Sequence, residues 1–280
     1  MIIYKKVIDI SVLIESTRRI NDSIGFVPTM GALHKGHLSL IEESKKDCNL
    51  TVCSIFVNPT QFNDKSDFEK YPVTLEADIA LLESVGCDVL FIPTVREIYP
   101  DNNSDYYDLG LLEEILEGKY RSGHFQGVCQ IVSRLLDVVR PSIVFVGQKD
   151  YQQCMVIKKL IQIRGMDASV VICPTKREFT GLAMSSRNVR LSVDGKVAAT
   201  AIYKSLLFVK ESISYLPLND VKEQVDTVLF KNGFSQIDYV EICDATSLKP
   251  ITYWDSTTPI VVLIAATIEG VRLIDNLVIS

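Results

Sequence analysis

The chain has 280 residues, of which 47% are hydrophobic and 23% charged, and its formal net charge is -6. A chain of this length can bury a substantial core, as one large domain or two of ordinary size. The negative charge argues against a general nucleic-acid binder, which needs a basic surface, although a local cluster of Lys and Arg can still hold the phosphates of a nucleotide.

Through the first two thirds of the chain, short apolar runs alternate with segments of helical periodicity. In chain order they predict strand 24–27, helix 38–46, strand 52–57, helix 75–82, strand 89–92, helix 128–139, strand 143–146, helix 155–163 and strand 170–172. This alternation is typical of a parallel sheet with helices on both faces. Ligands of such sheets bind beyond the carboxyl ends of the strands, and polar motifs follow Val27, Val57 and Val146.

The last third of the chain has a different pattern. Helices are predicted at 196–214 and 220–231, and strands at 238–243, 260–268 and 272–278. Glu269 and Gly270 predict a tight turn that joins the last two strands into a hairpin. We therefore expect an α/β protein. Its Rossmann-like parallel-sheet domain spans 1–175, and a smaller C-terminal α+β domain spans 176–280.

The cellular setting is predicted from the N-terminus, the apolar runs and the cysteines. Residues 1–7 lack the layout of a signal peptide, and Ile260–Ala266 is too short to span a bilayer. The seven cysteines are an odd number without a Cys-x-x-Cys pair, which favours buried reduced thiols, with a structural zinc site as the lesser alternative. We expect a cytoplasmic protein with no nucleic-acid partner and no membrane partner.

The first polar motif, Met30–His37, lies between a predicted strand and a predicted helix. Gly31 and Gly36 let backbone amides approach a ligand closely, and the start of a helix favours phosphate oxygens. His34 and His37 can face one point and donate hydrogen bonds to charge developing on a phosphate. Taken alone, two histidines in a loop also fit surface residues or metal ligands.

The second motif, Asn58–Phe62, follows a strand that must turn at its Asn-Pro step. The turn places the amides of Asn58 and Gln61 in one crevice, where they can donate to a carboxylate and accept from hydroxyls. Such contacts suit a small hydroxy acid. A loop held by local amide capping is the alternative.

Two further motifs carry positive charge. Gly147–Gln153 contains Lys149, which can neutralise phosphate charge at a strand end. Gly181–Asn188 offers Ser hydroxyls and the Arg187 fork as a triphosphate clamp. A capped helix with a solvated lysine and a generic polar linker are the respective alternatives.

A fifth motif, Glu117–Val128, adds Arg121 as a phosphate contact and His124 as a structural loop residue. The sequence contains no Gly-x-Ser-x-Gly elbow and no Walker-type loop. Positioning and charge neutralisation are therefore favoured over covalent catalysis.

In this order, the five motifs resemble the pantothenate synthetase family, and the resemblance extends to Arg272–Asn276. It implies ATP-dependent condensation of pantoate with β-alanine to pantothenate, a coenzyme A precursor. The implied route passes through pantoyl adenylate and releases pyrophosphate and AMP. The resemblance also implies Mg²⁺ with ATP, although the sequence shows no carboxylate cluster that fixes its ligands, and a homodimer formed through the larger domain.

The resemblance also implies roles for the two domains and for single residues. Residues 1–175 would bind ATP and pantoate, and residues 176–280 would form a lid. His37 matches the proton donor and His34 its phosphate-binding partner. The residues implied to stabilise the pentacovalent phosphate are Lys149, Ser185 and Arg187. The implied ATP-binding positions are Met30, Gly31, His34, Gly36, His37, Gly147, Gln148, Lys149, Asp150, Lys176 through its backbone, Met184, Ser185, Ser186 and Arg187. The implied substrate contacts are Gln61, Gln153, Asn58 and Arg121.

The sequence departs from the family pattern at Phe179-Thr180, Ser122 and Gln126, which puts the contacts of two loops in question. Two rival functions remain. One is a nucleotidyltransferase of the same superfamily acting on another small substrate, against which the Asn58–Gln61 and Met184–Arg187 motifs speak. The other is a catalytically silent nucleotide-binding module, against which the two histidines and the lysine speak.

Overall fold

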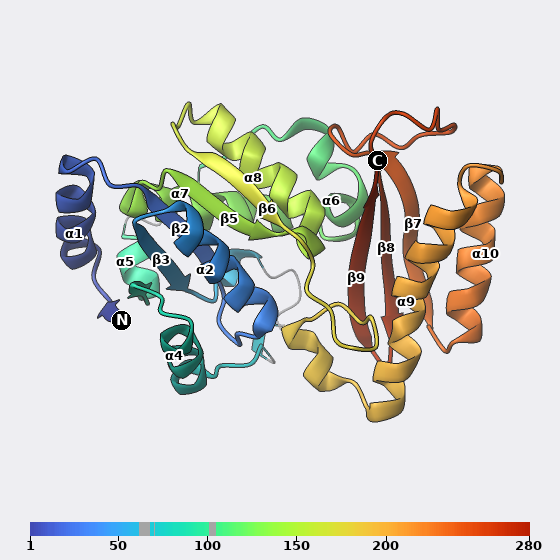
Figure 1. Cartoon of the computed structure of the whole chain (residues 1–280), viewed down its shortest axis with the longest axis horizontal. Coiled ribbons are helices and arrows are strands. Elements are labelled where there is room, and N and C mark those ends of the chain that lie inside the picture. Colours follow the sequence, from blue (N-terminus) through green and yellow to red (C-terminus); the bar gives the residue numbers. More distant parts are fainter. Residues whose placement is uncertain (62–67, 70, 101–104) are drawn as a thin grey trace. The chain divides into compact units, whose positions relative to one another are not determined.

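The structure is a computed structural model that describes residues 1–61, 68–69, 71–100 and 105–280. The chain divides into two compact units (Figure 1): the first comprises Met1–Gln148 and Gln152–Pro174, and the second comprises Lys149–Tyr151 and Thr175–Ser280. Phe62, the last residue of the second polar motif, lies outside the described residues. The roles assigned above to residues 1–175 and 176–280 stay predictions.

In the described part of the chain, the first unit contains a six-stranded parallel sheet with the strand order β1-β4-β3-β2-β5-β6. Its strands are β1 (Ile2–Tyr4), β2 (Ile24–Thr29), β3 (Leu50–Ile55), β4 (Val89–Phe91), β5 (Ile143–Gly147) and β6 (Ser169–Cys173). The predicted parallel, Rossmann-like sheet is confirmed. Because β2 lies between β3 and β5, the strands that precede the first three polar motifs are neighbours.

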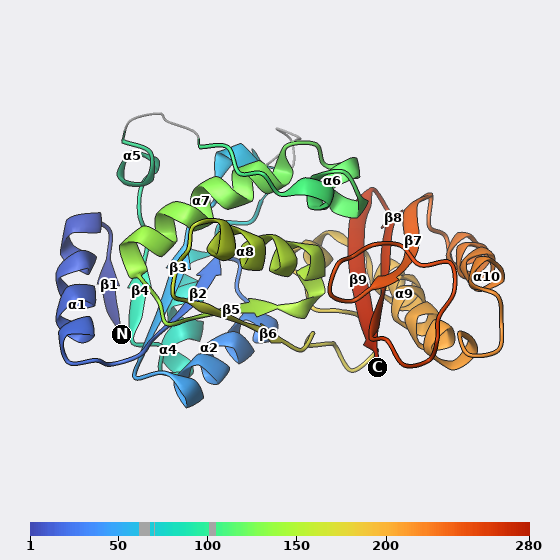
Figure 2. The same cartoon turned by 90° about the horizontal axis from the view of Figure 1, so that it is seen from above.

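Helices cover both faces of this sheet, because successive strand residues point to opposite faces. The helices are α1 (Val7–Arg19), α2 (Lys35–Asp47), α4 (Leu75–Ser84), α5 (Val95–Ile98), α6 (Leu116–Tyr120), α7 (His124–Val139) and α8 (Tyr151–Ile163). Short 3-10 turns are η1 (Pro59–Gln61), η2 (Gly110–Glu113) and η3 (Gln148–Asp150). Phe26 packs in the apolar cluster with α7 and α8, and its neighbour Val27 packs in the cluster with α2 and α4 (Figure 2).

The second unit contains a three-stranded antiparallel sheet in the order β7-β8-β9. Its elements are η4 (Ser186–Arg190), α9 (Val193–Ser212), α10 (Leu218–Lys231), β7 (Gln236–Asp244), β8 (Ile260–Ile268) and β9 (Val271–Ile279). Leu206 of α9 and Leu229 of α10 pack with Ile264 of β8 in one apolar core. The predicted hairpin is confirmed, because Glu269 (φ 50°) and Gly270 (φ 71°) have the positive φ values of a type I′ turn.

β1 and α1 precede the first predicted element and carry weak patterns. β1 is a three-residue edge strand in which both Ile2 and Ile3 are exposed. Helix α1 buries Ile10 and Ile14 but exposes other apolar side chains such as Val12, so its apolar stripe is interrupted. A periodicity argument finds such elements poorly, since it depends on a clean separation of buried and exposed positions.

The expectation of buried thiols is confirmed. Six of the seven cysteines are buried, Cys48 is partly exposed, and none of them forms a disulfide. Burial raises the pKa of the Cys87 thiol to about 11 and that of Cys129 to about 12. These thiols therefore stay protonated and unreactive at neutral pH.

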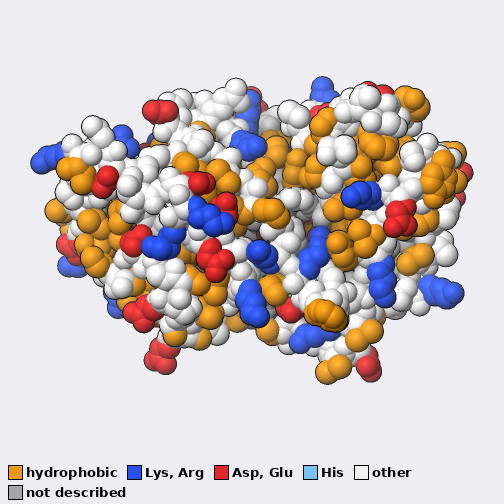
Figure 3. Space-filling view, in the orientation of Figure 1, with side chains coloured by type: hydrophobic (Ala, Val, Ile, Leu, Met, Phe, Trp, Pro, Cys, Tyr) orange, Lys and Arg blue, Asp and Glu red, His pale blue; other side chains and the backbone are white. Residues whose placement is uncertain are grey.

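Two observations concern the surface and the membrane prediction. On the face of the first unit seen in Figure 3, basic side chains are interspersed with acidic ones. Among the residues that the structure describes, no helix combines the length and the apolar character needed to cross a membrane.

Candidate active site

The first polar motif forms the turn from β2 into α2. His34 is the N-cap of α2: its Nδ1 accepts the Gly36 N–H at 3.1 Å, and its own backbone N–H donates to His37 Nδ1 at 3.3 Å. A ring nitrogen that accepts a hydrogen bond carries no proton, so each neutral ring carries its proton on Nε2. The ring centroids are 4.1 Å apart. The turn thus provides two Nε2–H donors beside the amides of a helix N-terminus.

Asp78 of α4 holds this turn in place. Its buried carboxylate accepts hydrogen bonds from the Ala32 N–H at 3.0 Å and from the Leu33 N–H at 2.8 Å. Gly31 has φ 82°, and a Cβ there would lie 3.0 Å from Asp78 Oδ2, so this backbone conformation and close approach favour glycine. Asp78 is not among the predicted site residues, although an acidic residue on the apolar stripe of a helix is a recognisable signal.

The Asp78→Asn variant is expected to lower the turnover of the ligation that the family resemblance implies about 10- to 100-fold, because small misplacements of catalytic groups have effects of this size. An asparagine keeps one acceptor oxygen but turns an N–H₂ group toward a backbone N–H that now bonds to the carboxylate. The turn that carries His34 and His37, called the histidine turn below, then shifts. Steady-state rates of AMP formation measure the effect.

Asp88→Asn is the control for that substitution. Asp88 Oδ2 accepts the Thr51 N–H at 2.9 Å, so this carboxylate also holds backbone in the first unit, but it does not bind the histidine turn. Thermal unfolding of both variants shows how much stability each change costs. Equal losses of turnover in the two variants at equal stability would remove Asp78 from the positioning of the turn.

The second motif is fixed by the side chain of Asn58, which is fully buried. Its Nδ2 donates to Thr60 Oγ1 and to the Gly127 carbonyl, both at 3.0 Å, and its Oδ1 accepts the Tyr99 hydroxyl at 2.9 Å. A Cβ at Gly127 would lie 2.5 Å from the Thr60 carbonyl oxygen, so η1 and α7 touch through backbone. These bonds agree with the alternative of a loop held by its own amide, and a substrate contact of Asn58 stays a prediction.

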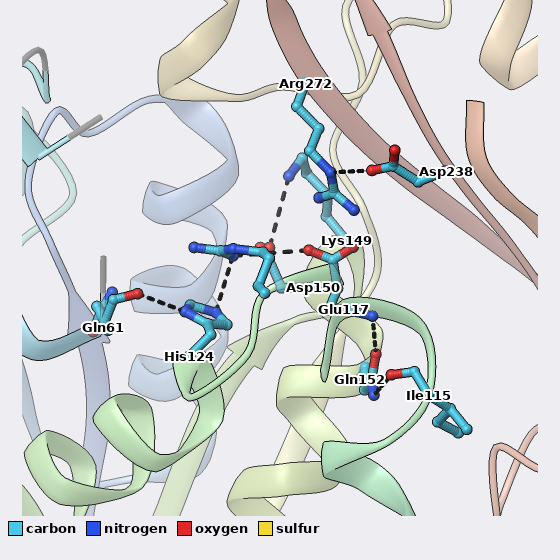
Figure 4. A network of polar contacts seen from close by, with 10 residues as sticks. Gln61, Ile115, Glu117, His124, Lys149, Asp150, Gln152, Asp238 and Arg272 are labelled. Carbon is cyan, nitrogen blue, oxygen red and sulfur yellow. Dashed lines mark hydrogen bonds and ion pairs between the residues drawn. The ribbon is translucent and has the colours of Figure 1, made fainter. Parts of the chain in front are cut away.

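Gln61 is held by residues from two motifs. Its Nε2 lies 2.7 Å from Met30 Sδ. Its carbonyl lies 2.8 Å from His124 Nδ1 (Figure 4). Arg121 Nη1, which can only donate, lies 3.0 Å from His124 Nε2, so Nδ1 carries the proton and donates to Gln61. Arg121 also lies 3.8 Å from the Glu117 carboxylate. His124 is therefore a structural residue, and the substrate contact of Arg121 stays a prediction.

The third motif is divided between the units, with Gly147, Gln148 and Gln153 in the first. Gln153 is half-buried on the first turn of α8. Its neighbour Gln152 is buried, accepts the Glu117 N–H and donates to the carbonyls of Leu112 and Ile115, each at 2.9 Å (Figure 4). Gln152 therefore fixes the segment that carries the fifth motif.

Lys149 and Asp150 belong to the second unit. The Lys149 side chain is 17% exposed, and its Nζ lies 3.8 Å from Asp150 Oδ1. The Lys149 carbonyl accepts a hydrogen bond of 2.9 Å from Asn276 Nδ2. Because this ammonium group is largely buried and the Asp150 carboxylate lies 3.8 Å away, little of its electrostatic field is screened. A phosphate-binding lysine requires such a field.

The fourth motif begins after a small turn. Met184 N–H donates to the Lys176 carbonyl at 3.0 Å, while the Lys176 side chain is exposed. Ser185 is the N-cap of η4, and its Oγ accepts the Arg187 N–H at 3.3 Å. Ser186 and Arg187 follow, both half-buried. The ATP contacts assigned to these residues stay predictions.

Two of the departures from the family pattern have a visible structural setting. The Gln126 side chain accepts the Tyr107 N–H at 3.1 Å and donates to the Tyr107 carbonyl at 2.7 Å and to Glu113 at 2.8 Å, which ties α7 to the chain before η2. Phe179 is fully exposed at the tip of the turn before the fourth motif.

The structure brings predicted site residues together within each unit. In the first unit, Met30–His37, Asn58–Gln61 and Gly147–Gln148 follow adjacent parallel strands. In the second unit, Lys149–Asp150 and Lys176–Arg187 are both connected to β9, through Asn276 and through Arg177. The connections through Asp78, Asn276 and Arg177 do not follow from sequence patterns.

Comparisons with known proteins agree with this geometry. Residues 2–278 match the family model described as pantoate-beta-alanine ligase. A pantothenate synthetase of Cytophaga hutchinsonii is 47% identical over 264 residues, which cover 94% of this chain and 93% of that protein. A pantothenate synthetase of Porphyromonas gingivalis is 42% identical over 99% of both chains.

Solved structures give the same result. The crystal structure of pantothenate synthetase from Thermus thermophilus superposes with a TM-score of 0.91 at 36% identity and covers 99% of both chains. That of pantoate-beta-alanine ligase from Francisella tularensis, complexed with beta-gamma ATP and beta-alanine, has a TM-score of 0.82 at 35% identity, covering 99% of this chain and 97% of the other. The chain belongs to the pantoate–β-alanine ligase family and is an acid–amine ligase.

Proposed function

We propose that this chain condenses pantoate with β-alanine in two steps. The pantoate carboxylate attacks the α-phosphate of ATP, which forms pantoyl adenylate and releases pyrophosphate. The amine of β-alanine then attacks the acyl carbon, loses a proton and displaces AMP, which gives pantothenate, a coenzyme A precursor. Family membership supports the ligation rather than the rival nucleotidyltransferase.

The observation that carries this proposal is the histidine turn. The Nδ1 atoms of His34 and His37 accept backbone N–H groups, which leaves the protonated Nε2 of each ring as its donor. Two such donors at a helix N-terminus suit the charge that builds on a phosphate during in-line displacement. In this proposal His37 is the proton donor and His34 binds phosphate.

Other residues complete the proposal. Lys149, Ser185 and Arg187 of the second unit stabilise the pentacovalent phosphate. Gln61 and Gln153 contact pantoate, with Gln61 held by its bonds to Met30 and His124. The relative from Francisella tularensis, crystallised with an ATP analogue and β-alanine, supports the same ligands for this chain. The ATP- and pantoate-binding role of residues 1–175 and the lid role of residues 176–280 belong to this proposal.

Mg²⁺ is proposed to accompany ATP. Among the described residues, no group of three or more His, Cys, Asp and Glu side chains is suited to hold a metal ion. The protein's donor set therefore fits an ion that is held mainly by phosphate oxygens and water, as Mg²⁺ at nucleotides often is. The ion supplies charge neutralisation when it is bound.

The test mixes the purified protein with ATP, Mg²⁺, pantoate and β-alanine and then omits each component in turn. We expect AMP and pantothenate only in the complete mixture, and exchange of labelled pyrophosphate into ATP with pantoate alone. ADP as the product, or no turnover, contradicts the ligase. Exchange that needs β-alanine contradicts a separate adenylate step.

We also propose that the protein is a cytoplasmic homodimer. Cysteines that are mostly buried and form no disulfide suit a reducing compartment, and the family resemblance suggests the dimer. Light scattering after size exclusion measures the mass: about twice that of the 31.3 kDa chain supports the dimer, and a single chain contradicts it.

A further inference from the structure

The Arg272–Asn276 segment of β9 carries two buried polar residues, Asp275 and Asn276, whose purpose the reaction scheme does not explain. Their side chains point to opposite faces of the sheet, because strand residues alternate. Asp275 shares its face with Val271, Leu273 and Ile279, which pack in the apolar core with α9. Burying a carboxylate among these apolar side chains has a desolvation cost. Burial therefore raises the pKa of Asp275, although the Arg177 guanidinium acts to lower it.

Asp275 holds Arg177, and Arg177 holds the turn before the fourth motif. The guanidinium bonds to both Asp275 oxygens, one at 3.0 Å, and its carbon lies 3.8 Å above the Tyr203 ring of α9. Its Nη1 donates to the Gly181 carbonyl at 3.2 Å. Gly181 itself is pressed against Tyr203, since a Cβ there would lie 2.6 Å from the ring.

The turn between Arg177 and Ala183 leads directly into Ser185–Arg187 of the fourth motif. Arg177 and Ala183 form an antiparallel bridge, and the Glu178 N–H donates to the Leu182 carbonyl at 2.8 Å. Asn188 Nδ2 then donates to the Ala183 carbonyl at 2.9 Å, across the residues that include Ser185. Through these bonds the position of Ser185–Arg187 depends on Arg177.

Asn276 holds the other phosphate-binding segment of the same unit. Its side chain is 1% exposed, and Nδ2 donates to the Lys149 carbonyl at 2.9 Å. Its backbone N–H donates to Asp275 Oδ1 at 2.8 Å, so the Asp275 carboxylate is also bonded to the strand backbone at Asn276. Strand β9 thus holds the backbone of Lys149 through Asn276 and the guanidinium of Arg177 through Asp275.

We propose that Asp275 and Asn276 are a positioning pair that sets Lys149 and the Ser185–Arg187 segment at the spacing required by the phosphates of ATP. This rests on the proposed function, in which both segments stabilise the same pentacovalent phosphate. Neither residue of the pair touches the reacting atoms. The pair acts through Lys149 and through Arg177.

A double-mutant cycle tests the connection between Asn276 and Lys149. Asn276→Ser is expected to lower kcat of pantoate-dependent ATP–pyrophosphate exchange about 10- to 100-fold while the KM for pantoate changes less than about 3-fold. In a Lys149→Met background the same substitution is expected to change kcat less than about 3-fold, because the group it positions is gone. Asn232→Ser is the control, since Asn232 Nδ2 also donates to a backbone carbonyl of this unit, that of Val228, at 2.8 Å.

The connection through Arg177 is tested with Arg177→Lys. This variant keeps a positive charge beside Asp275 but loses the bidentate bond to the carboxylate and the hydrogen bond to the Gly181 carbonyl. We expect a loss of kcat of about 10-fold or more that becomes clearly smaller in an Arg187→Met background, where only Ser185 remains to be positioned. This variant also keeps the proposal testable when Asn276→Ser does not fold.

The outcomes separate this inference from the proposed function. Wild-type protein that makes no pantothenate contradicts the proposed function itself. Active wild-type protein with unchanged kcat in Asn276→Ser and Arg177→Lys overturns the positioning pair. Equal losses in the wild-type and Lys149→Met backgrounds overturn it as well, because a merely structural role acts independently of the lysine.

Discussion

The His37→Ala variant is expected to turn over at least about 100-fold more slowly than the wild-type chain, the scale of losing a general acid or an oxyanion donor. In the proposed function His37 supplies Nε2–H toward the ligand, and in the structure its Nδ1 accepts the His34 N–H. Alanine removes both functions at once. The rate of AMP formation and the rate of ATP–pyrophosphate exchange should fall together, because the proposed role lies in the first chemical step.

Two further substitutions separate these functions of the ring. His37→Asn places a carboxamide oxygen near the position of Nδ1, so it can keep the bond to the His34 N–H but lacks the distal donor. His37→Gln reaches the position of Nε2 with an N–H₂ group. We expect His37→Asn to be as slow as His37→Ala, and His37→Gln to retain clearly more activity.

The control for the lost capping bond between His37 Nδ1 and the His34 N–H is Thr94→Ala, which removes the bond at the start of α5, where Thr94 Oγ1 accepts the Glu97 N–H at 3.3 Å. A lost cap costs about 1 kcal/mol of stability. Thermal unfolding should show a loss of this size in His37→Ala and Thr94→Ala, but turnover should fall in the histidine variant alone. Near-normal turnover of His37→Ala would remove His37 from the mechanism.

The Lys149→Met variant is expected to lower kcat about 100- to 1,000-fold, the size measured when one donor to a developing charge is removed. Methionine approximates the length of the aliphatic stem and deletes the ammonium group. Because the Lys149 side chain is 17% exposed, water replaces its charge poorly. The measurement is steady-state kinetics with ATP varied at saturating pantoate and β-alanine.

Lys222→Met is the matched control. Lys222 is also a partly buried lysine of the second unit, with a side chain 23% exposed and its Nζ 2.7 Å from Glu241 Oε2. This lysine lies outside the predicted site, so its replacement should leave kcat within about 3-fold of wild type and change mainly stability. A comparable loss of kcat in both variants would assign the effect to the unit as a whole and not to Lys149.

The central strands of the parallel sheet and the helices that cover it could be predicted from local sequence patterns. The residues at which the helices begin could not. Helix α2 was predicted from residue 38 and begins at Lys35, because His34 caps it, and histidine is not a usual N-cap residue. Helix α7 was predicted from residue 128 and begins at His124, after Gly123 in the left-handed region. Periodicity locates buried faces, but caps depend on single side-chain bonds.

The candidate site was predictable to a similar degree. The motifs at Met30–His37, Asn58–Gln61 and Gly147–Asp150 could be placed after three strands, since parallel strands direct their carboxyl ends to one edge. Their internal bonds could not. The amide of Asn58 has the chemistry of a substrate contact, yet in the structure both of its ends bond to protein partners.

By itself, then, the sequence determined the class of the sheet and the order of its motifs, because period and motif spacing are properties of neighbouring residues. It also predicted the histidine turn as a place for phosphate chemistry. The packed fold alone decided which carboxylate holds the turn and what fixes Lys149, whereas the bonds of the two histidine rings lie within the turn itself. Asp78 and Asn276 reach partners far away in the chain. Such pairs depend on distances that only the packed fold defines, and no local pattern encodes them.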